Sequence, residues 1–378
     1  MSASAAGAPE QKHLLLVGGG HAHVHVLKAL VTAPMSNARV SLVTPYARQL
    51  YSGMIPGYIA GHYSMDDCAI ELPALARAAS VTLVQGSVKA LNAEASAVTL
   101  EDGEVIAYDI ISINSGPVLS IAAASTAIKG VANYPERVIT VRPIEQFVQW
   151  WDEFASAARA SSKVVIVGAG AAGVELAFAM RYRLGHAATI TLLTGGTPPV
   201  PGHSLRVQER VARALKAQHI EVVMEACVAV DASCVTTQSG TRIECDACVL
   251  ALGTQAPQWL RGSGLALDER GFISVNIAQR SVSHANVFAV GDVASRADTP
   301  HAKSGVFAVR AGAPLTENLR RACANQTPVP YPIEQRNLNL LSCGERYAIV
   351  SWGGFSAEGA WAWHWKNWVD KRFMARYR

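Results

Sequence analysis

The segment KHLLLVGGGHAH, residues 12–23, joins an apolar run to three consecutive glycines and then to residues that can continue as a helix. The run 14–17 predicts a strand buried on both faces of a parallel sheet. Gly18 allows a tight turn, and Gly20 allows a phosphate to approach the backbone. A strand, a glycine turn and a helix N-terminus in this order bring backbone N–H groups to a pyrophosphate. The segment predicts a dinucleotide-binding turn, with a purely structural turn as the alternative.

The same arrangement occurs a second time, in VVIVGAGAAGVE, residues 164–175. Here the GxGxxG pattern is intact at Gly168, Gly170 and Gly173, after a β-branched run and before an alanine-rich helix. In the first copy, His23 takes the place of the third glycine. The two copies are separated by about the length of a domain. Two such turns in one chain predict two bound dinucleotides.

Composition excludes several classes of protein. Half of the 378 residues are hydrophobic and 16% are charged, which is typical of an ordered globular chain. A net charge of +4 does not predict a nucleic-acid partner, and seven scattered cysteines do not form a secreted disulfide framework. Residues 1–11 lack the regions of a signal peptide, and no stretch is long and apolar enough to span a bilayer. We therefore expect a cytoplasmic protein.

Apolar runs and turn residues place the remaining elements. Strands are expected at residues 39–44, 81–85, 98–100, 108–114, 163–167, 189–193, 247–252, 271–275, 287–292 and 347–352. Helices are expected at residues 24–31, 144–159, 205–218 and 305–320. The segment 126–142 is expected to cross between two units. The alternation of strands and helices predicts an α/β protein.

Glycine and polar residues follow several of these strands. Gly116 and Gly253 close two of them, and the strand 287–292 ends in Gly-Asp. The strand 39–44 ends in Thr44, where a dinucleotide fold normally carries an acid for a ribose hydroxyl. The apolar segment YSGMIPGY, residues 51–58, is broken by glycine and proline and cannot be a long regular element. It must cover either the core or the face of a planar ring.

These motifs resemble the FAD-dependent pyridine nucleotide–disulfide oxidoreductase superfamily over nearly the whole chain. Within it, the chain is most similar to the type II NADH dehydrogenase and sulfide:quinone reductase branch. It is closer still to the NADH-dehydrogenase-like flavoproteins sometimes found fused to selenide,water dikinase. The residues that carry the resemblance are 18–23, 51–57, 265–271, 287–292 and 372–376.

The resemblance implies an α/β fold with two Rossmann-like dinucleotide-binding domains, for FAD and NAD(P), the second inserted in the first, plus a C-terminal appendage. It implies an FAD-binding domain of residues 1–125 and 259–327, an NAD(P)-binding domain of residues 126–258, and a Trp-rich tail of residues 328–378. No metal ligand is expected. The cofactor-binding residues that it implies are Gly18, Gly20, His21, Ala22, Thr44, Gly116, Gly168, Gly170, Gly173, Gly253, Gly291 and Asp292.

Three residues receive a chemical role from the resemblance. Asp292 would accept hydrogen bonds from the ribityl chain of FAD, or else cap the next helix. Glu175 would lie near the nicotinamide–flavin contact, or else be an acid favoured at a helix N-terminus. Lys303 would stabilise negative charge on the reduced ring, or else be a solvated surface lysine. Glu175 and Lys303 are the two expected catalytic residues.

The choice between NADH and NADPH depends on Thr194 and the two glycines after it, at the end of the strand 189–193. They offer neither the acid that favours NADH nor an arginine for a 2′-phosphate. NADH is the preferred expectation.

Cysteines and histidines leave further alternatives. Cys245 and Cys248 form a CxxC pair at the start of a strand, where positions i and i+3 point to opposite faces, so we expect buried structural cysteines. Cys343 is the alternative redox thiol, because the sulfide:quinone branch uses a C-terminal cysteine near the flavin. His21 and His25 could share a metal, but histidine contacts to the FAD phosphates or ring are the preferred interpretation.

The tail combines aromatic and basic residues. Trp361, Trp365 and Trp368 fall at i, i+4 and i+7 of a helix. Lys366 and four other cations crowd the same region, which is typical of an interfacial helix on anionic lipid. A helix that covers the FAD domain or forms a homodimer contact is the equal alternative. Peripheral contact with the cytoplasmic face of a membrane is therefore one expectation for the tail.

The first functional hypothesis is a flavoenzyme that takes a hydride from NAD(P)H onto FAD and passes electrons to a quinone or a similar small acceptor. The second is a sulfur- or selenium-directed flavoprotein reductase or oxidase that uses Cys343. The third is a non-enzymatic FAD-binding redox sensor.

Overall fold

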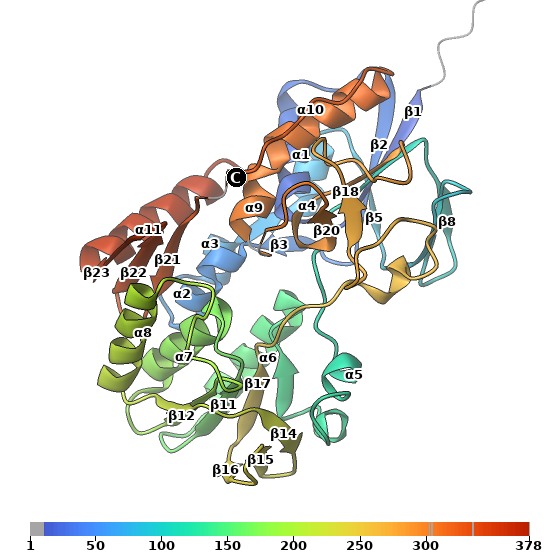
Figure 1. Cartoon of the computed structure of the whole chain (residues 1–378). Helices are drawn as coiled ribbons and strands as arrows, with labels where there is room; N and C mark the ends of the chain where they lie inside the picture. The colour runs from blue at the N-terminus through green and yellow to red at the C-terminus, as the bar shows by residue number, and fades with distance from the viewer. Residues whose placement is uncertain (1–10, 302, 304, 335, 378) are drawn as a thin grey trace, which may run out of the picture.

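Two five-stranded parallel sheets form the framework of the molecule (Figure 1). The computed structural model describes residues 11–301, 303, 305–334 and 336–377. The first sheet has the order β19-β9-β1-β2-β5, from Val287–Ala289, Ile110–Ile113, Lys12–Val17, Ala38–Thr44 and Thr82–Gln85. The second has the order β10-β17-β11-β12-β13, from Val138–Thr140, Ala247–Leu250, Lys163–Val167, Thr189–Leu193 and Glu221–Val223.

The second sheet is inserted in the first. All five of its strands lie between β9 and β19 in the sequence, and β19 returns to pair with β9 in parallel. The structure thus confirms the predicted α/β fold with one Rossmann-like unit inserted in another.

The apolar runs lie in the strands because both faces of each sheet are covered. Leu14 and Leu16 of β1 pack on the side of α1 (His21–Thr32), whereas Leu15 and Val17 pack on the opposite side. Residues 164–167 of β11 alternate in the same way between two clusters. Side chains on adjacent positions of a strand point to opposite faces, so a strand buried on both sides must be apolar throughout.

Helices cover both sheets. Those of the first unit include α4 (Leu72–Ala78), α9 (Gly305–Arg310) and α10 (Gly312–Cys323), which lie against α1. Those of the second unit include α6 (Ile144–Ala157), α7 (Ala171–Leu184) and α8 (Leu205–Ala217). Shorter helices are η1 (Ser52–Met54), α2 (Ile55–Ile59), α3 (Met65–Cys68), α5 (Ile121–Ala124), η2 (Val131–Asn133), η3 (Gln258–Leu260) and η4 (Gly291–Val293).

Small sheets and the tail complete the chain. Two antiparallel meanders are β6-β7-β8 (Val88–Asn92, Ala97–Leu100, Val105–Ala107) and β14-β15-β16 (Cys227–Val230, Cys234–Thr237, Arg242–Glu244). Two-stranded pairs are β3-β4 (Arg48–Leu50, Ala69–Glu71) and β18-β20 (Ile273–Val275, Ala294–Arg296). The tail forms β21-β22-β23 (Leu338–Ser342, Ala348–Trp352, Phe355–Gly359) and then α11 (Ala360–Met374).

Several expected elements differ in the structure. The helix expected over 305–320 is two helices that break at residue 311, because the ring of Pro314 clashes with the carbonyl four residues earlier. The strand expected over 287–292 ends at Ala289, since Gly291 turns the chain with φ +70°. The crossover 126–142 contains an additional strand, β10. The segment 51–58 is short helical turns, as its glycines and proline predict.

Candidate functional site

The first glycine turn is packed tightly against the end of β9. The N–H of Gly18 donates to the carbonyl of Val43 at 2.8 Å, and Gly18 has φ +90°. A Cβ on Gly18 would lie 2.5 Å from Cα of Ser115. Gly20 caps α1, whose N-terminus offers no side-chain cap of its own. The turn therefore presents a helix N-terminus at the carboxyl edge of the sheet, where phosphates bind.

Asn114 ties this turn to β19, and sequence reasoning did not assign it a role. Its Oδ1 accepts a hydrogen bond from the N–H of Ala22 at 3.1 Å, and its Nδ2 donates to the carbonyl of Val290 at 2.9 Å. A Cβ on Gly20 would lie 2.3 Å from Oδ1, and one on Gly291 would lie 2.7 Å from Nδ2. Both predicted glycines therefore make room for Asn114. The only signal in the sequence is a polar residue directly after a buried strand.

The three histidines near the turn have three different environments. His23 is fully buried, with Nδ1 2.6 Å from the carbonyl of Gly18 and Nε2 2.8 Å from the hydroxyl of Ser112. His25 faces Tyr377, with Nδ1 3.3 Å from its hydroxyl. Both ring nitrogens of His23 therefore bond within the protein and are not available to FAD, whereas for His25 only Nδ1 has such a partner among the described residues.

His21 lies at the cavity. Burial lowers the pKa of its imidazole from 6.5 to about 4, with a further contribution from the nearby charge of Arg142, so the ring is neutral near pH 7. Its Nε2 is buried and has no hydrogen-bond partner among the described residues.

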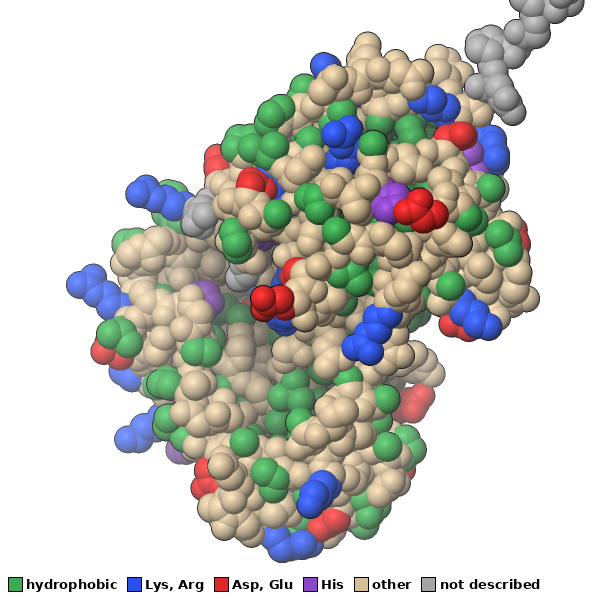
Figure 2. All heavy atoms as spheres, turned by 45° about the vertical axis from the view of Figure 1, so that its right-hand side comes forward, with side chains coloured by type: hydrophobic (Ala, Val, Ile, Leu, Met, Phe, Trp, Pro, Cys, Tyr) green, Lys and Arg blue, Asp and Glu red, His purple; other side chains and the backbone are tan. Residues whose placement is uncertain are grey.

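A cavity of about 350 Å³ opens in front of the first turn, within the range of small-molecule sites. Figure 2 shows the surface hollowed between the upper and lower parts of the molecule, with hydrophobic side chains around the hollow. Of the predicted residues, Gly18, Gly20, His21, Thr44, Gly116 and Asp292 line the cavity. Ala22 and Gly291 do not line the cavity, but they are the chain neighbours of His21 and Asp292, which do.

Two charged residues of the cavity wall come from the segment before α6 and from its first turn. Arg142 Nη2 lies 3.9 Å from Oδ2 of Asp292. Burial raises the pKa of the Glu145 carboxyl, and the charge of Arg142 opposes this. Both residues line the cavity. Sequence reasoning missed them because Arg142 lies in the crossover and Glu145 in the helix after it, both outside the glycine motifs. Only the folded sheet order brings them to the first turn.

Lys303 has its amine turned toward the protein. The Nζ atom donates a hydrogen bond to the carbonyl of Ala294 and lies 4.0 Å from the ring centroid of Phe272. Burial lowers the pKa of this amine to about 8, although the charge of Asp292 opposes the shift. The structure thus brings Lys303 into the neighbourhood of Asp292, but its strongest contacts are with the protein.

The second glycine turn repeats the first at the end of β11. The N–H of Gly168 donates to the carbonyl of Leu193 at 2.8 Å, and Gly168 has φ +110°. A Cβ on Gly173 would lie 1.9 Å from the carbonyl oxygen of Gly168, whereas one on Gly170 would meet no protein atom within 4 Å. Gly170 and the exposed Gly253 therefore leave space that the protein does not fill.

The loop after β12 covers this second turn. The N–H of Val200 donates to the carbonyl of Ala169 at 2.8 Å. At the beginning of the loop, Thr194 is 7% exposed, and its Oγ1 has no hydrogen-bond partner in the described part of the chain. In a dinucleotide-binding unit, the end of the second strand is where a ribose binds. The Thr194 hydroxyl lies at that position of the second unit.

Glu175 lies at the junction of the two units and the tail. Its Oε1 accepts a hydrogen bond from the N–H of Ser342 at 2.8 Å. Burial raises the pKa of the carboxyl to about 7, and the charge of Lys366 opposes this shift. Glu175 does not line the first cavity; it is the fifth residue of α7, beyond the first turn of the helix that begins at the second glycine turn, so the expected place in that first turn is wrong.

The first cavity has the features that a flavin dinucleotide requires. It combines a helix N-terminus for the pyrophosphate, a carboxylate for sugar hydroxyls and an unpaired buried imidazole nitrogen. Gly116 faces it, and a Cβ on this residue would meet no protein atom within 4 Å. The residues that would hold the pyrophosphate are those of the first turn, with Asp292 at the ribityl chain and Thr44 at the adenosine ribose.

The seven cysteines lie in the core of the molecule. All seven are buried, and none of them forms a disulfide. Burial raises the pKa of Cys245 to about 12 and that of Cys248 well above its usual value. Cys343 is 1% exposed, and burial raises the pKa of its thiol as well. The prediction that Cys245 and Cys248 are buried is confirmed.

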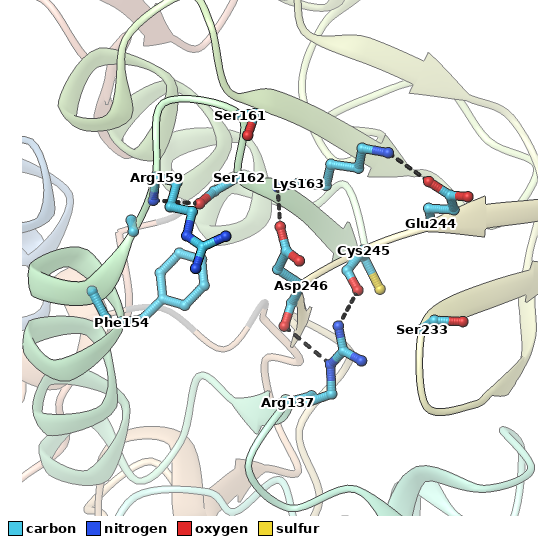
Figure 3. A pocket seen from close by; sticks show the side chains of 12 residues that line it. Arg137, Phe154, Arg159, Ser161, Ser162, Lys163, Ser233, Glu244, Cys245 and Asp246 are labelled. Atoms are coloured by element: carbon cyan, nitrogen blue, oxygen red, sulfur yellow. Dashed lines mark hydrogen bonds and ion pairs between the residues drawn. The ribbon is translucent and has the colours of Figure 1, made fainter.

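A further cavity of about 510 Å³ lies at the other end of the second sheet, where β11 begins (Figure 3). Two of its charged side chains are bound within the protein: Lys163 Nζ lies 2.5 Å from Oε2 of Glu244, and Arg137 Nη2 donates to the carbonyl of Cys245 at 2.6 Å. No predicted site residue lines it. Within the described chain, no group of three or more His, Cys, Asp or Glu side chains is placed to hold a metal ion.

The predicted tail helix is present as α11, and its two faces differ. Trp361 and Trp368 are 50% and 56% exposed, whereas Phe373 is buried and stacks on Tyr51 with ring centroids 4.4 Å apart. Lys366, expected among the surface cations, is buried as well. The buried face of α11 therefore packs on the first unit, which is one of the alternatives expected for the tail. None of the described helices is long and apolar enough to cross a membrane.

Fold and site together define an oxidoreductase that binds two dinucleotides. The chain belongs to the pyridine nucleotide-disulphide oxidoreductase family, whose family model matches residues 12–312. This family uses FAD and a pyridine nucleotide.

Named relatives have similar lengths. The oxidoreductase ptaL of Pestalotiopsis fici is 22% identical over 366 residues, which cover 92% of this chain and 93% of that protein. The NADH dehydrogenase-like protein YutJ of Bacillus subtilis is 24% identical over 302 residues, which cover 79% and 80%.

Solved structures share the fold. The sulfide:quinone oxidoreductase of Aquifex aeolicus has a TM-score of 0.80 at 17% identity, covering 97% of this chain and 91% of that chain. NDH2 of Plasmodium falciparum in complex with NADH has a TM-score of 0.79 at 13% identity, covering 96% and 98%.

Proposed function

We propose that this protein is an FAD-dependent NAD(P)H dehydrogenase that delivers electrons to a small, quinone-like acceptor. When bound, FAD supplies the redox chemistry, accepting a hydride from the nicotinamide and passing electrons on. The protein binds and orients the two cofactors. The first turn and Asp292 hold FAD, while Gly168, Gly170 and Gly173 hold the nucleotide.

The observation that supports this proposal most is the pair of glycine turns, each at the carboxyl edge of a parallel sheet in one chain. Ligands of such sheets bind at that edge. NADH is the proposed donor, since the second strand of the inserted unit ends without an arginine for a 2′-phosphate. Quinone is proposed because the Aquifex structure with this fold is a sulfide:quinone oxidoreductase.

Anaerobic reduction tests the proposal. Purified protein should be yellow, and its flavin absorption should bleach when NADH is added without oxygen. Addition of a soluble quinone should restore the colour. A coloured protein that neither NADH nor NADPH bleaches would contradict the dehydrogenase and leave an FAD-binding sensor as the better description.

A sulfur- or selenium-directed reaction at Cys343 has less support, because this thiol is 1% exposed and burial raises its pKa. A thiol attacks as the thiolate, so a buried neutral thiol is a poor nucleophile. Replacement of Cys343 with Ser should leave NADH-dependent turnover unchanged. Loss of turnover in a correctly folded Cys343→Ser protein would revive this alternative.

We also propose that the exposed face of α11 binds the cytoplasmic face of an anionic membrane. Trp361 and Trp365 stack with ring centroids 6.3 Å apart, and Arg372 lies over the ring of Trp368 at 5.2 Å. Indole rings beside cations favour the interfacial region of a bilayer. A Trp361→Ser/Trp368→Ser protein should no longer sediment with anionic vesicles. Unchanged sedimentation, or a dimer that dissociates instead, would contradict the membrane contact.

A further inference from the structure

A small cavity shares Asp292 with the first cavity. Its volume is about 30 Å³, which gives room for about two water molecules. Residues of β18, β20, η4 and α9 line it. Asp292 lines this cavity as well as the larger one, so it belongs to the walls of both. Among the other lining residues, the buried polar side chains are those of Gln279 and Arg296.

Gln279 carries a buried oxygen that the protein does not satisfy. The residue is 3% exposed, and its Nε2 donates a hydrogen bond to the carbonyl of Ala311 at 3.1 Å. This bond fixes which end of the amide is the donor, so the position of Oε1 is fixed as well. Oε1 is buried and has no hydrogen-bond partner among the described residues. A buried amide oxygen is costly unless something bonds to it, and the small cavity is the space from which a partner can reach it.

The backbone at Gln279 is of a kind that other residue types adopt more easily. Its φ is +63°, in the left-handed region where glycine and asparagine are usual. The turn is held on both sides: the carbonyl of Gln279 accepts from the N–H of Ala289 at 3.0 Å, and Asn276 Oδ1 accepts from the N–H of Ala278 at 2.9 Å. A glutamine kept in this conformation indicates that its long side chain has a function of its own.

Arg296 supplies donors to the same cavity. It is 5% exposed, and its Nε and Nη2 donate to the two carboxylate oxygens of Asp298 at 2.7 Å each. Its Nη1 donates to the carbonyl of Tyr331 at 3.0 Å. Nη1 and Nη2 each carry a second N–H group that can donate to water. Water can accept from the guanidinium and donate to oxygens at the same time, whereas a metal cation would be repelled by Arg296.

We propose that this cavity is a site for ordered water, which joins Oε1 of Gln279 to the carboxylate of Asp292 and makes Gln279 a positioning residue of the FAD site. The water donates to both oxygens and accepts from Arg296. Asp292 is thereby held in the orientation in which it accepts hydrogen bonds from the ribityl chain. This inference rests on the proposed function, because it takes Asp292 to hold FAD.

Crystal structures of the FAD-loaded protein test the site directly. The wild type should show a water molecule within hydrogen-bond distance of both Gln279 Oε1 and a carboxylate oxygen of Asp292. Gln279→Met keeps the length of the side chain but removes the acceptor, so this water should be lost. The carbonyl of Ala311 still accepts from the N–H of Leu315 at 3.0 Å, so the substitution leaves no unpaired carbonyl. A wild-type structure without this water, or with a water that reaches only one of the two oxygens, would overturn the proposal.

FAD affinity supplies a readout that a purely structural role would not move. In calorimetric titrations of the apoprotein, Gln279→Met should weaken FAD binding by about five- to tenfold. Asp292→Ala should weaken it more. The double variant should bind FAD no more weakly than Asp292→Ala alone, because both substitutions break the same chain of hydrogen bonds. Losses that add in the double variant would contradict the link through water.

Two further variants separate the side chain from the backbone. Gln279→Asn suits a φ of +63°, but its amide is shorter by one methylene group. It should fold as stably as the wild type and still lose FAD affinity as Gln279→Met does. If Gln279→Met does not fold, this variant decides, and wild-type affinity in it would overturn the proposal. Gln238→Met, at an exposed glutamine of the inserted unit, is the matched control and should change neither stability nor affinity.

The two proposals fail in different experiments. A protein that binds FAD but is not bleached by NADH would contradict the proposed dehydrogenase, while the water and the affinities would still report on Gln279 and Asp292. A protein that NADH bleaches, but in which the two residues act independently, would contradict the water site alone.

Discussion

The two glycine turns of this chain reach one backbone geometry with different residues. Gly18 and Gly168 both have positive φ, and the N–H of each donates to the neighbouring strand at 2.8 Å. At the third position, His23 bridges Gly18 and Ser112 through its two ring nitrogens, whereas Gly173 has no room for a Cβ. A glycine is therefore needed at the third position only where the helix lies very close to the turn. Its presence or absence does not by itself indicate whether a dinucleotide binds.

Substitution of Gly173 should have the largest effect. In Gly173→Val, a Cβ would lie 1.9 Å from a backbone oxygen, so we expect at least about 3 kcal/mol of lost stability and no NADH-driven bleaching. Thermal unfolding and anaerobic spectra measure this. Gly170→Ala is the matched control, because a Cβ there meets no protein atom within 4 Å. It should fold normally but bind NADH more weakly. A stable Gly173→Val protein would contradict the close approach.

Loss of the His23 side chain should have the next largest effect. His23→Ala removes two buried hydrogen bonds and leaves a cavity, so we expect a loss of about 2–4 kcal/mol in urea unfolding. His23→Gly restores the glycine pattern of the second turn but should be no more stable than His23→Ala. Wild-type stability in His23→Gly would mean that the two hydrogen bonds of the His23 ring do not stabilise the first turn.

Acid should affect the first turn selectively. Burial lowers the pKa of both His21 and His23 from 6.5 to about 4. The unfolded chain binds these protons more readily, so the stability from neutral rings is complete above pH 6.5 and is lost as the pH falls toward 4. Each ring should contribute a loss of about 2 kcal/mol between pH 7 and pH 5. Urea midpoints should fall less with pH in His21→Asn than in the wild type, and an equal fall would contradict this.

The smallest effects should come from the threonines that end the second strand of each unit. Thr44 Oγ1 accepts from the N–H of Tyr46 at 3.4 Å, whereas Thr194 Oγ1 has no partner among the described residues. Thr44→Val should weaken FAD binding, and Thr194→Val should weaken NADH binding, each by about tenfold or less. Stability should change by less than about 0.5 kcal/mol. Calorimetric titration measures the affinities, and unchanged values would remove these hydroxyls from the sites.

Much of the fold follows from local sequence. The bounds of β11 and β12 agree with the expectation, because a β-branched run flanked by turn residues has few other solutions. The break between α9 and α10 was missed, although Pro314 was visible, because apolar periodicity continues across it. The additional strand β10 was missed because a three-residue strand becomes stable only when β17 lies beside it.

The site was less accessible to sequence reasoning than the fold. Gly18, His21 and Asp292 meet at one cavity, as the motifs predict. Asn114 was missed because its function depends on two backbone groups from different elements. Lys366 was assigned to the surface because the tail sequence places cations around the helix without showing which face is covered. Tertiary packing decides these orientations.

The return of β19 to β9 has a consequence for synthesis on the ribosome. Ile111 pairs with Val287, so the first sheet cannot close until the whole inserted unit has been made. The inserted sheet uses residues 138–250 alone and can form earlier. Until β19 emerges, one side of β9 presents unpaired backbone groups, which is the kind of edge that recruits other chains. The nascent chain is therefore most prone to aggregation in its first-made half, even though that half contains the first glycine turn.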